Sequence, residues 1–253
     1  MIAAARARWH RGPVAPPLVW GHRGASADAL ENTLTAFRLA RTQGADGVEL
    51  DVTRCKSGEV VVFHDDDLQR LAKRPERVRD LPWTELRDID LGGGEHMPLL
   101  DDVLAELGTL LVNIELKTAP TWPERILDDG LAAQVAALVA HHDAAARVLV
   151  SSFDPLLLGR FRRRAPRIAT GLLFAHDQAR PNREAWAAPL LRPTALHPEG
   201  MLVDARNVRQ WHARGYAVNV WTVDDAAELR LLSALGVDGV ITNRPAATRA
   251  VIQ

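Results

Sequence analysis

The amino-acid sequence predicts an α/β protein built as a single large domain, a distorted (β/α)8 barrel with its helices outside the strands. Short apolar runs typical of strands alternate with helical patterns, which indicates a mainly parallel sheet covered by helices. The chain has 253 residues, a length at which single α/β barrels are common. The strand-like runs number eight, as a closed barrel of this type requires.

The eight runs are separated by signals that start and end helices. They lie at residues 18–20, 47–48, 60–63, 110–112, 148–151, 169–174, 217–223 and 238–242. Asn32-Thr33 and Asp154-Pro155 are typical helix starts, because a short polar side chain caps the first turn and proline fits the first helical position. Glycines that accept the left-handed conformation at a helix end stand at Gly44, Gly108, Gly215 and Gly236.

One connection does not fit a regular barrel. Only residues 53–59 separate the second strand from the third, too few for the crossover of a dozen or more residues that parallel strands need. Ser57-Gly58 indicates a tight turn there, so we expect this part of the barrel to be distorted or locally antiparallel. Residues 71–98 have weak patterning and are predicted to form a loop excursion.

Composition excludes several classes of function. A formal net charge of −1 gives no general attraction to nucleic acid or anionic lipid. The single cysteine, Cys55, excludes an intrachain disulfide framework and favours a reducing, cytoplasmic compartment. No apolar stretch approaches the roughly 20 residues of a membrane span. Residues 1–17 are rich in alanine and arginine and are predicted to be a loose N-terminal tail before a domain at 18–253, while the oligomeric state stays open.

Charged and imidazole side chains gather where four of the strands should end. Residues two apart on a strand share a face, so Glu49 and Asp51 point the same way. Three carboxylates converging at one end of a sheet need a cation, and oxygen ligands without sulfur suit Mg²⁺ or Ca²⁺. Two imidazoles and a guanidinium beside such an ion indicate acid–base chemistry on a phosphate ester. The group comprises His22, Arg23, Glu49, Asp51, His64, Glu115 and Lys117.

The working face of an α/β barrel is the end at which its strands finish. All seven residues would lie at that end, with Trp221 and Thr242 across the mouth. The remaining histidines lack acidic neighbours at ligand spacing and are predicted to be surface residues, and Glu31 and Asn32 are most simply a helix start. Those histidines are His10, His96, His141, His142, His176, His197 and His212.

Several separated motifs resemble the glycerophosphodiester phosphodiesterase family, a group of phospholipase-C-like phosphodiesterase TIM barrels. The resemblance covers about residues 18–250 in order. It implies a distorted TIM barrel that uses a divalent metal to hydrolyse a small-molecule glycerophosphodiester to glycerol 3-phosphate and an alcohol. The motifs are Gly21-His22-Arg23-Gly24, Glu31-Asn32-Thr33, Glu49-Leu50-Asp51-Val52, His64-Asp65, Ile114-Glu115-Leu116-Lys117, Val220-Trp221-Thr222-Val223 and the run at 236–245.

The resemblance also implies roles for individual residues. Position by position, the metal ligands are Glu49, Asp51 and Glu115. The acid–base pair is His22 and His64, and Arg23 and Lys117 hold the phosphate. Trp221 is either packing at the mouth or a wall of the glycerol site. The chain departs from the family at Leu30, where proline is usual, and at Gln69-Arg70-Leu71-Ala72 in place of Asp-Arg-Thr-Thr. These changes leave the alcohol group of the substrate undetermined.

Some alternatives stay open at this point. The sequence does not decide between Mg²⁺ and Ca²⁺, which histidine is the base, or whether water or the glycerol hydroxyl is the nucleophile. A metal-dependent enolising barrel is a rival enzyme, although such sites take one acid from each of three successive strands. A catalytically inactive barrel that binds phosphodiesters is the rival outside enzymology.

Overall fold

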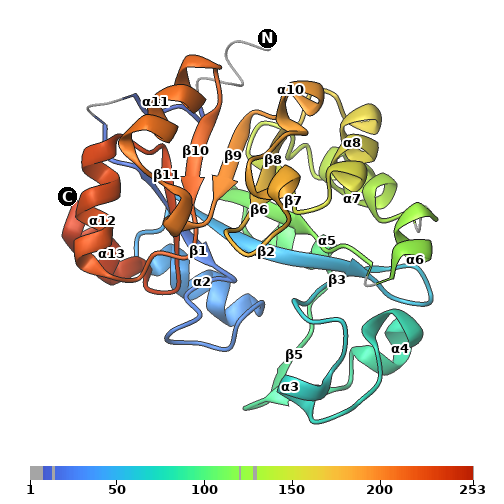
Figure 1. Ribbon diagram of the computed structural model, residues 1–253. Helices are drawn as coiled ribbons and strands as arrows, with labels where there is room; N and C mark the ends of the chain where they lie inside the picture. The colour runs from blue at the N-terminus through green and yellow to red at the C-terminus, as the bar shows by residue number, and fades with distance from the viewer. Residues whose placement is uncertain (1–7, 13–14, 120, 128–129, 253) are drawn as a thin grey trace.

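A computed structural model describes residues 8–12, 15–119, 121–127 and 130–252 of the chain. Eight parallel strands form a closed barrel with helices around it (Figure 1). The strands follow the order β1-β11-β10-β9-β8-β7-β6-β2, and pairing of β1 with β2 closes the ring. Their bounds are β1 Leu18–His22, β2 Gly47–Arg54, β6 Leu111–Leu116, β7 Val148–Ser152, β8 Ala169–Phe174, β9 Ala195–Pro198, β10 Ala217–Val220 and β11 Gly239–Thr242. The predicted fold class is confirmed.

The third predicted strand lies outside the ring. β3 (Val60–Val62) pairs antiparallel with the end of β2, with Val62 opposite Val52. This agrees with the expected irregularity after residue 52. The eighth barrel strand is instead β9, which the sequence analysis did not count. β9 has only four residues, includes His197 and ends at a proline, so it offers no apolar run that sequence reasoning could recognise.

The helices begin and end where local chemistry predicts. The Thr33 hydroxyl accepts a hydrogen bond from the amide of Ala36, and Asp154 caps the helix after β7. All four predicted glycines have positive φ angles. The longer helices are α2 Leu34–Thr42, α5 Leu100–Glu106, α7 Leu131–His141, α8 Pro155–Arg164, α11 Ala205–Ala213, α12 Ala226–Leu235 and α13 Pro245–Ile252. The shorter ones are α3 Gln69–Ala72, α4 Trp83–Leu86, α6 Trp122–Ile126, α9 Arg180–Arg183, α10 Ala188–Leu191, and the 3-10 turns η1 Val78–Asp80 and η2 Gly200–Leu202.

A small excursion follows β3 and stands apart from the ring at the bottom of Figure 1. It contains α3, η1, α4 and the hairpin of β4 (Asp90–Gly92) with β5 (Glu95–His96). Phe63, Leu68, Val78 and Leu86 bury their side chains in a core of its own. Because the excursion begins directly after β3, it carries His64 to the barrel mouth.

Buried polar side chains lie among the barrel strands. The Ser151 hydroxyl donates to the Asn113 amide oxygen at 2.9 Å, and the Asn219 amide lies 3.0 Å from His197 Nε2. His197 was predicted to be a surface residue, but only 1% of it is exposed and burial lowers its pKa to about 3. The error follows directly from missing β9.

Three other histidines have acidic partners that lie far away in the sequence. Nε2 of His142 lies 2.8 Å from Asp101, and Nε2 of His212 lies 2.8 Å from the buried Asp238. His176 makes a third such pair, between its Nδ1 and the Glu199 carboxylate. The smallest separation in the sequence is the 23 residues between His176 and Glu199, so spacing along the chain could not reveal these pairs.

Part of the predicted N-terminal tail packs on the barrel. Trp9 is 2% exposed and its ring stacks on Trp20, with centroids 5.9 Å apart. The amide of Arg11 donates to Asp238 at 2.7 Å. The expectation of a loose tail is therefore wrong for residues 8–12, because an indole covers apolar surface at the start of β1. Residues 1–7 and 13–14 lie outside the described part of the chain.

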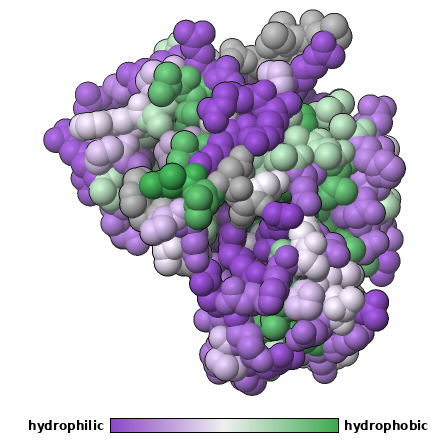
Figure 2. Space-filling model, turned by 90° about the vertical axis from the view of Figure 1, so that its right-hand side faces the viewer, coloured by the Kyte–Doolittle hydropathy of each residue, from purple (hydrophilic) through white to green (hydrophobic). Residues whose placement is uncertain are grey.

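The surface is largely polar. Figure 2 views the face at the right of Figure 1 and shows hydrophilic side chains over much of it, with apolar residues in separate groups. Among the described residues, no helix combines the length and apolar character needed to cross a bilayer.

Candidate active site

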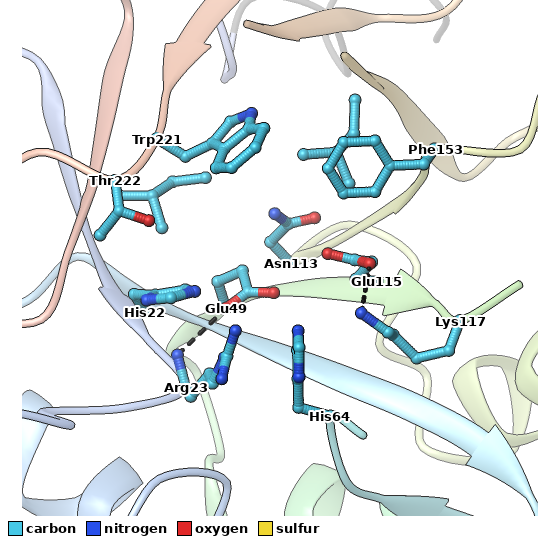
Figure 3. A pocket seen from close by; sticks show the side chains of 12 residues that line it. His22, Arg23, Glu49, His64, Asn113, Glu115, Lys117, Phe153, Trp221 and Thr222 are labelled. Carbon is cyan, nitrogen blue, oxygen red and sulfur yellow. Dashed lines mark hydrogen bonds and ion pairs between the residues drawn. The ribbon is translucent and has the colours of Figure 1, made fainter. Parts of the chain in front are cut away.

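A cavity of about 120 Å³ opens at the end of the barrel where the strands finish (Figure 3). β1 and β2 contribute His22 and Glu49, and Glu115 comes from β6. The residues predicted for this end of the barrel line the cavity except Asp51, whose carboxylate adjoins Glu49 and Glu115, and Thr242, which is buried and donates to Asp224. Sequence reasoning missed its other lining residues, which are Asn113, Phe153, Leu173, Thr222 and Ile241.

Three buried carboxylates form the floor of the site. Oxygens of Glu49, Asp51 and Glu115 all lie within 4.8 Å of one another, and the residues are 4%, 1% and 8% exposed. Asn32 orients the Asp51 carboxylate, because its amide nitrogen donates to Asp51 Oδ2 at 2.9 Å. Asn32 is itself buried with a φ of 57°. Its contact with Asp51 goes beyond the helix start that the sequence indicated.

Two cations contact this cluster from opposite sides. Arg23 Nε lies 3.3 Å from Asp51 Oδ2, and the Arg23 amide donates to Glu49 Oε2 at 3.1 Å. Lys117 Nζ lies 3.0 Å from Glu115 Oε1 and 3.3 Å from Asp51 Oδ1. The central carboxylate, Asp51, is therefore the one that both cations share.

The pKa values of the three acids separate accordingly. Burial, followed by the charge of Asp51, raises the pKa of Glu49 well above its usual range. Burial also raises the pKa of Glu115 to about 7, although Lys117 works against it. Burial opposes ionisation of Asp51 too, but Lys117 and the other nearby positive charges lower its pKa.

The cluster is consequently short of positive charge. Two of its three acids bind protons more readily than free carboxylic acids do, even with Arg23 and Lys117 in contact. A divalent ion can replace those protons, and an all-oxygen set of donors suits a hard cation. The side chains present therefore fit a metal ion.

Hydrogen bonds fix the tautomer of His22. Asn243 Nδ2 donates to the Asp224 carboxylate at 2.6 Å, which turns the amide oxygen of Asn243 toward His22. That oxygen lies 2.7 Å from His22 Nδ1 and can only accept, so Nδ1 carries the proton. Nε2 is then an acceptor, and burial lowers the pKa of His22, which keeps the ring neutral.

His64 has a carboxylate partner instead. Its Nδ1 lies 2.6 Å from Asp65 Oδ1, and the other Asp65 oxygen accepts from Arg70 Nε at 2.6 Å. Arg70 also reaches Glu31 at 3.0 Å, and Glu31 accepts from Arg23 at 2.9 Å. This alternating network connects His64 to Arg23, and sequence reasoning did not anticipate it.

Aromatic rings form the opposite wall. Trp221 and Phe153 meet edge to face with ring centroids 5.4 Å apart. The Trp221 indole donates to the carbonyl oxygen of His197 at 2.8 Å, which fixes the ring over the cavity. Figure 3 shows Trp221, Thr222 and His22 on one side of the pocket and Phe153 and Lys117 on the other.

Fold and site together define an α/β barrel with a buried carboxylate cluster and two histidines at its mouth, and comparison with known proteins identifies the family. The model of the glycerophosphoryl diester phosphodiesterase family matches residues 22–247. A glycerophosphodiester phosphodiesterase from Caldanaerobacter subterraneus is 32% identical, over 90% of this chain and 94% of its own. One from Bacillus altitudinis is 31% identical, with the same coverage. The chain therefore belongs to the glycerophosphoryl diester phosphodiesterase family, and the predicted enzyme class is confirmed.

Solved structures agree over nearly the whole length. A phosphodiesterase from Oleispira antarctica, in complex with its product sn-glycerol-3-phosphate, superposes with a TM-score of 0.83 and 28% identity. That match covers 94% of this chain and 97% of the other. The glycerophosphodiester phosphodiesterase from Thermotoga maritima gives a TM-score of 0.77 at 30% identity, over 93% and 98% of the two chains.

Proposed function

We propose that this protein hydrolyses glycerophosphodiesters to glycerol 3-phosphate and an alcohol, with a divalent metal ion and two histidines. The observation that carries the proposal is the joining of three features in one cavity. These are an oxygen cluster short of positive charge, two imidazoles in different electrostatic surroundings, and two cations that can hold a phosphate. Supporting it, the product in the Oleispira antarctica complex is a glycerol phosphate.

Glu49, Asp51 and Glu115 would hold the metal ion, which we expect to be Mg²⁺ or Ca²⁺. Bound there, a divalent ion supplies charge that stabilises a phosphoryl oxygen and lowers the pKa of a bound hydroxyl. Arg23 and Lys117 would orient the phosphate from either side. The planar guanidinium of Arg23 can bind two phosphate oxygens at once, which an ammonium cannot imitate.

The two histidines would divide the proton transfers between them. His22 is the general base, because its Nε2 is unprotonated at neutral pH and Asn243 holds the ring in that tautomer. His64 would be the general acid that donates to the leaving alkoxide, because Asp65 holds its ring through Nδ1 and His22 takes the role of the base. Trp221 would form a wall against the glycerol carbons.

Turnover of glycerophosphodiesters tests this function. We expect release of glycerol 3-phosphate that stops on exhaustive chelation and returns with Mg²⁺ or Ca²⁺. His22→Ala and His64→Ala should each lower kcat by roughly 10²–10⁴-fold. Calorimetric metal titration should be unaffected in both variants, since neither side chain is assigned to the metal. Full activity after chelation would refute the metal assignment, and binding without cleavage would favour an inactive binding barrel.

A further inference from the structure

A second and larger cavity adjoins the active site. It has a volume of about 570 Å³ and shares Glu115, Lys117 and Phe153 with the smaller one. A phosphodiester has two arms on one phosphate, and a phosphate between Arg23 and Lys117 would stand at the boundary of the two cavities. Figure 3 shows Lys117 and Phe153 on the side away from His22 and Trp221. The smaller cavity therefore suits the glycerol arm, and the larger one suits the alcohol that leaves.

The larger cavity offers hydrogen-bonding groups that are not used up within the protein. Gln178 Oε1 accepts from the Ala175 amide at 3.1 Å, which leaves its amide nitrogen available to a ligand. Within the described parts of the chain, the side chain of Asn182 makes no hydrogen bond of its own. Asp154 accepts helix amides through Oδ1 alone, at 2.8 and 3.3 Å, so Oδ2 can accept from a hydroxyl.

The cavity is not built to recognise a quaternary ammonium group, because its lining charges balance and it offers one aromatic face. Arg125 lines it and donates through Nε to the carbonyl oxygen of Ala119 at 2.8 Å. No carboxylate among the described residues forms an ion pair with Arg125. The segment is anchored, since Arg160 Nη1 donates to the Arg125 carbonyl oxygen at 2.8 Å. Quaternary ammonium groups are recognised by several aromatic faces, whereas Phe153 is the one aromatic lining residue here.

We propose that the larger cavity is the leaving-alcohol site and that it selects an uncharged polyhydroxy alcohol, such as glycerol or inositol, over choline. The proposal rests on the proposed hydrolase function and adds its substrate class. Amide donors, the Arg125 guanidinium and the free Asp154 oxygen match a ring or chain of hydroxyls, each of which both donates and accepts. A trimethylammonium group can neither donate nor accept a hydrogen bond, and it would gain no aromatic cage in this cavity.

The test compares kcat/KM for four diesters of sn-glycerol 3-phosphate, namely the inositol, glycerol, choline and methyl esters. In the wild type we expect the inositol and glycerol diesters to exceed the choline diester at least about tenfold, because a good hydrogen bond is worth up to roughly 1.5 kcal/mol. The methyl ester is the internal control, since its leaving group is too small to reach Asn182. Equal values for the inositol and choline diesters would overturn the proposal.

Two variants connect the preference to the cavity. Asn182→Ala should lower kcat/KM for the inositol diester about 3–10-fold and leave the methyl ester unchanged. Arg125→Glu should raise kcat/KM for the choline diester, whereas the matched charge reversal Arg163→Glu, at an exposed position outside the cavity, should not. An equal effect of either cavity variant on the methyl ester and the inositol diester would refute the assignment.

Two further measurements decide which arm occupies the cavity and separate binding from chemistry. Inhibition by sn-glycerol 3-phosphate should be the same in wild type and Asn182→Ala; weaker inhibition in the variant would put the glycerol arm in the larger cavity and overturn the proposal. Calorimetric titration of the same diesters covers the case in which none is cleaved. Preferential binding of the inositol diester would then refute the hydrolase function and support the polyol site, while equal binding would refute both.

Discussion

Removing the carboxylate of Glu115 should stabilise the metal-free protein in alkaline solution. Glu115 is 8% exposed and lies in the acidic cluster with Glu49 and Asp51. Burial raises its pKa to about 7, although Lys117 at 3.0 Å favours the ionised form. Glu115→Gln keeps the size and planarity of the side chain and removes the charge. Lys117 retains its second partner, Asp51, at 3.3 Å.

The direction and size of the effect follow from proton binding. A glutamate in the unfolded chain has a pKa near 4.5, so the folded state holds the proton more tightly than the unfolded state. Stability from this group is therefore intact below pH 4.5 and is lost as the pH rises toward 7. The difference between 4.5 and about 7 corresponds to roughly 3 kcal/mol at alkaline pH. Glu115→Gln should escape this loss.

Urea denaturation in the presence of a chelator measures the effect. Between pH 5 and pH 8, the free energy of unfolding of Glu115→Gln should rise relative to wild type by about 2.5 kcal/mol. Glu85→Gln, at an exposed position on α4, should show no such change and serves as the control. A difference between Glu115→Gln and wild type that stays constant with pH would refute the argument, because Glu115 would then be ionised throughout.

The same experiment with metal should remove most of this difference in stability. An ion that binds only the folded state stabilises it by about 2.7 kcal/mol at a concentration one hundred times its Kd. Wild type should gain this at pH 8 on addition of Mg²⁺ or Ca²⁺, and Glu115→Gln should gain much less because one ligand has lost its charge. Equal gains in both proteins would exclude Glu115 as a ligand.

Three further substitutions test other parts of the molecule. Arg23→Lys should lower kcat/KM at least tenfold with an unchanged thermal transition, because lysine cannot replace a bidentate guanidinium; near wild-type kinetics would leave Arg23 a structural ion-pair partner. Arg70→Met should lower kcat roughly 10-fold, without affecting metal titration, because it frees Asp65 and Glu31; an unchanged kcat would show that the network does not orient His64. Asp238 raises the pKa of His212, so His212→Ala should destabilise the protein most below pH 6.5. This destabilisation should shrink as the pH rises through the folded pKa of His212. Equal losses of unfolding free energy in urea titrations at pH 6 and pH 8 would contradict the prediction.

The parts of the site that could be predicted are those governed by local rules. Glu49 and Asp51 share a face because strand side chains alternate, and both do point into the acidic cluster. The same rule relates Glu115 to Lys117, which meet at 3.0 Å. The parallel strands of an α/β barrel all finish at the same end of the barrel. These two pairs could therefore be expected to meet there even though they lie far apart in the sequence.

The parts that could not be predicted depend on contacts between distant segments. Arg70 belongs to the excursion after β3, and only the folded chain brings it to Glu31, 39 residues earlier. Asn243 reaches His22 across 221 residues, and no pattern along the chain encodes that pairing. The prediction missed β9 for a different reason, because a four-residue strand buried within the barrel needs no long apolar run.

Closure of the barrel is what orients the imidazole of His22. β1 pairs with β2 on one side, with His22 in register with Glu49, and with β11 on the other, with Gly21 in register with Thr242. The first pairing brings the imidazole to the carboxylate cluster. The second brings it to Asn243, which holds the proton on Nδ1. Because β1 and β11 lie at opposite ends of the sequence, Asn243 selects the tautomer that frees Nε2 only when the ring of strands is complete. An open or partly folded barrel could hold the acidic residues of β2 and β6 together, since those strands pair directly, but it would leave the His22 ring without this partner.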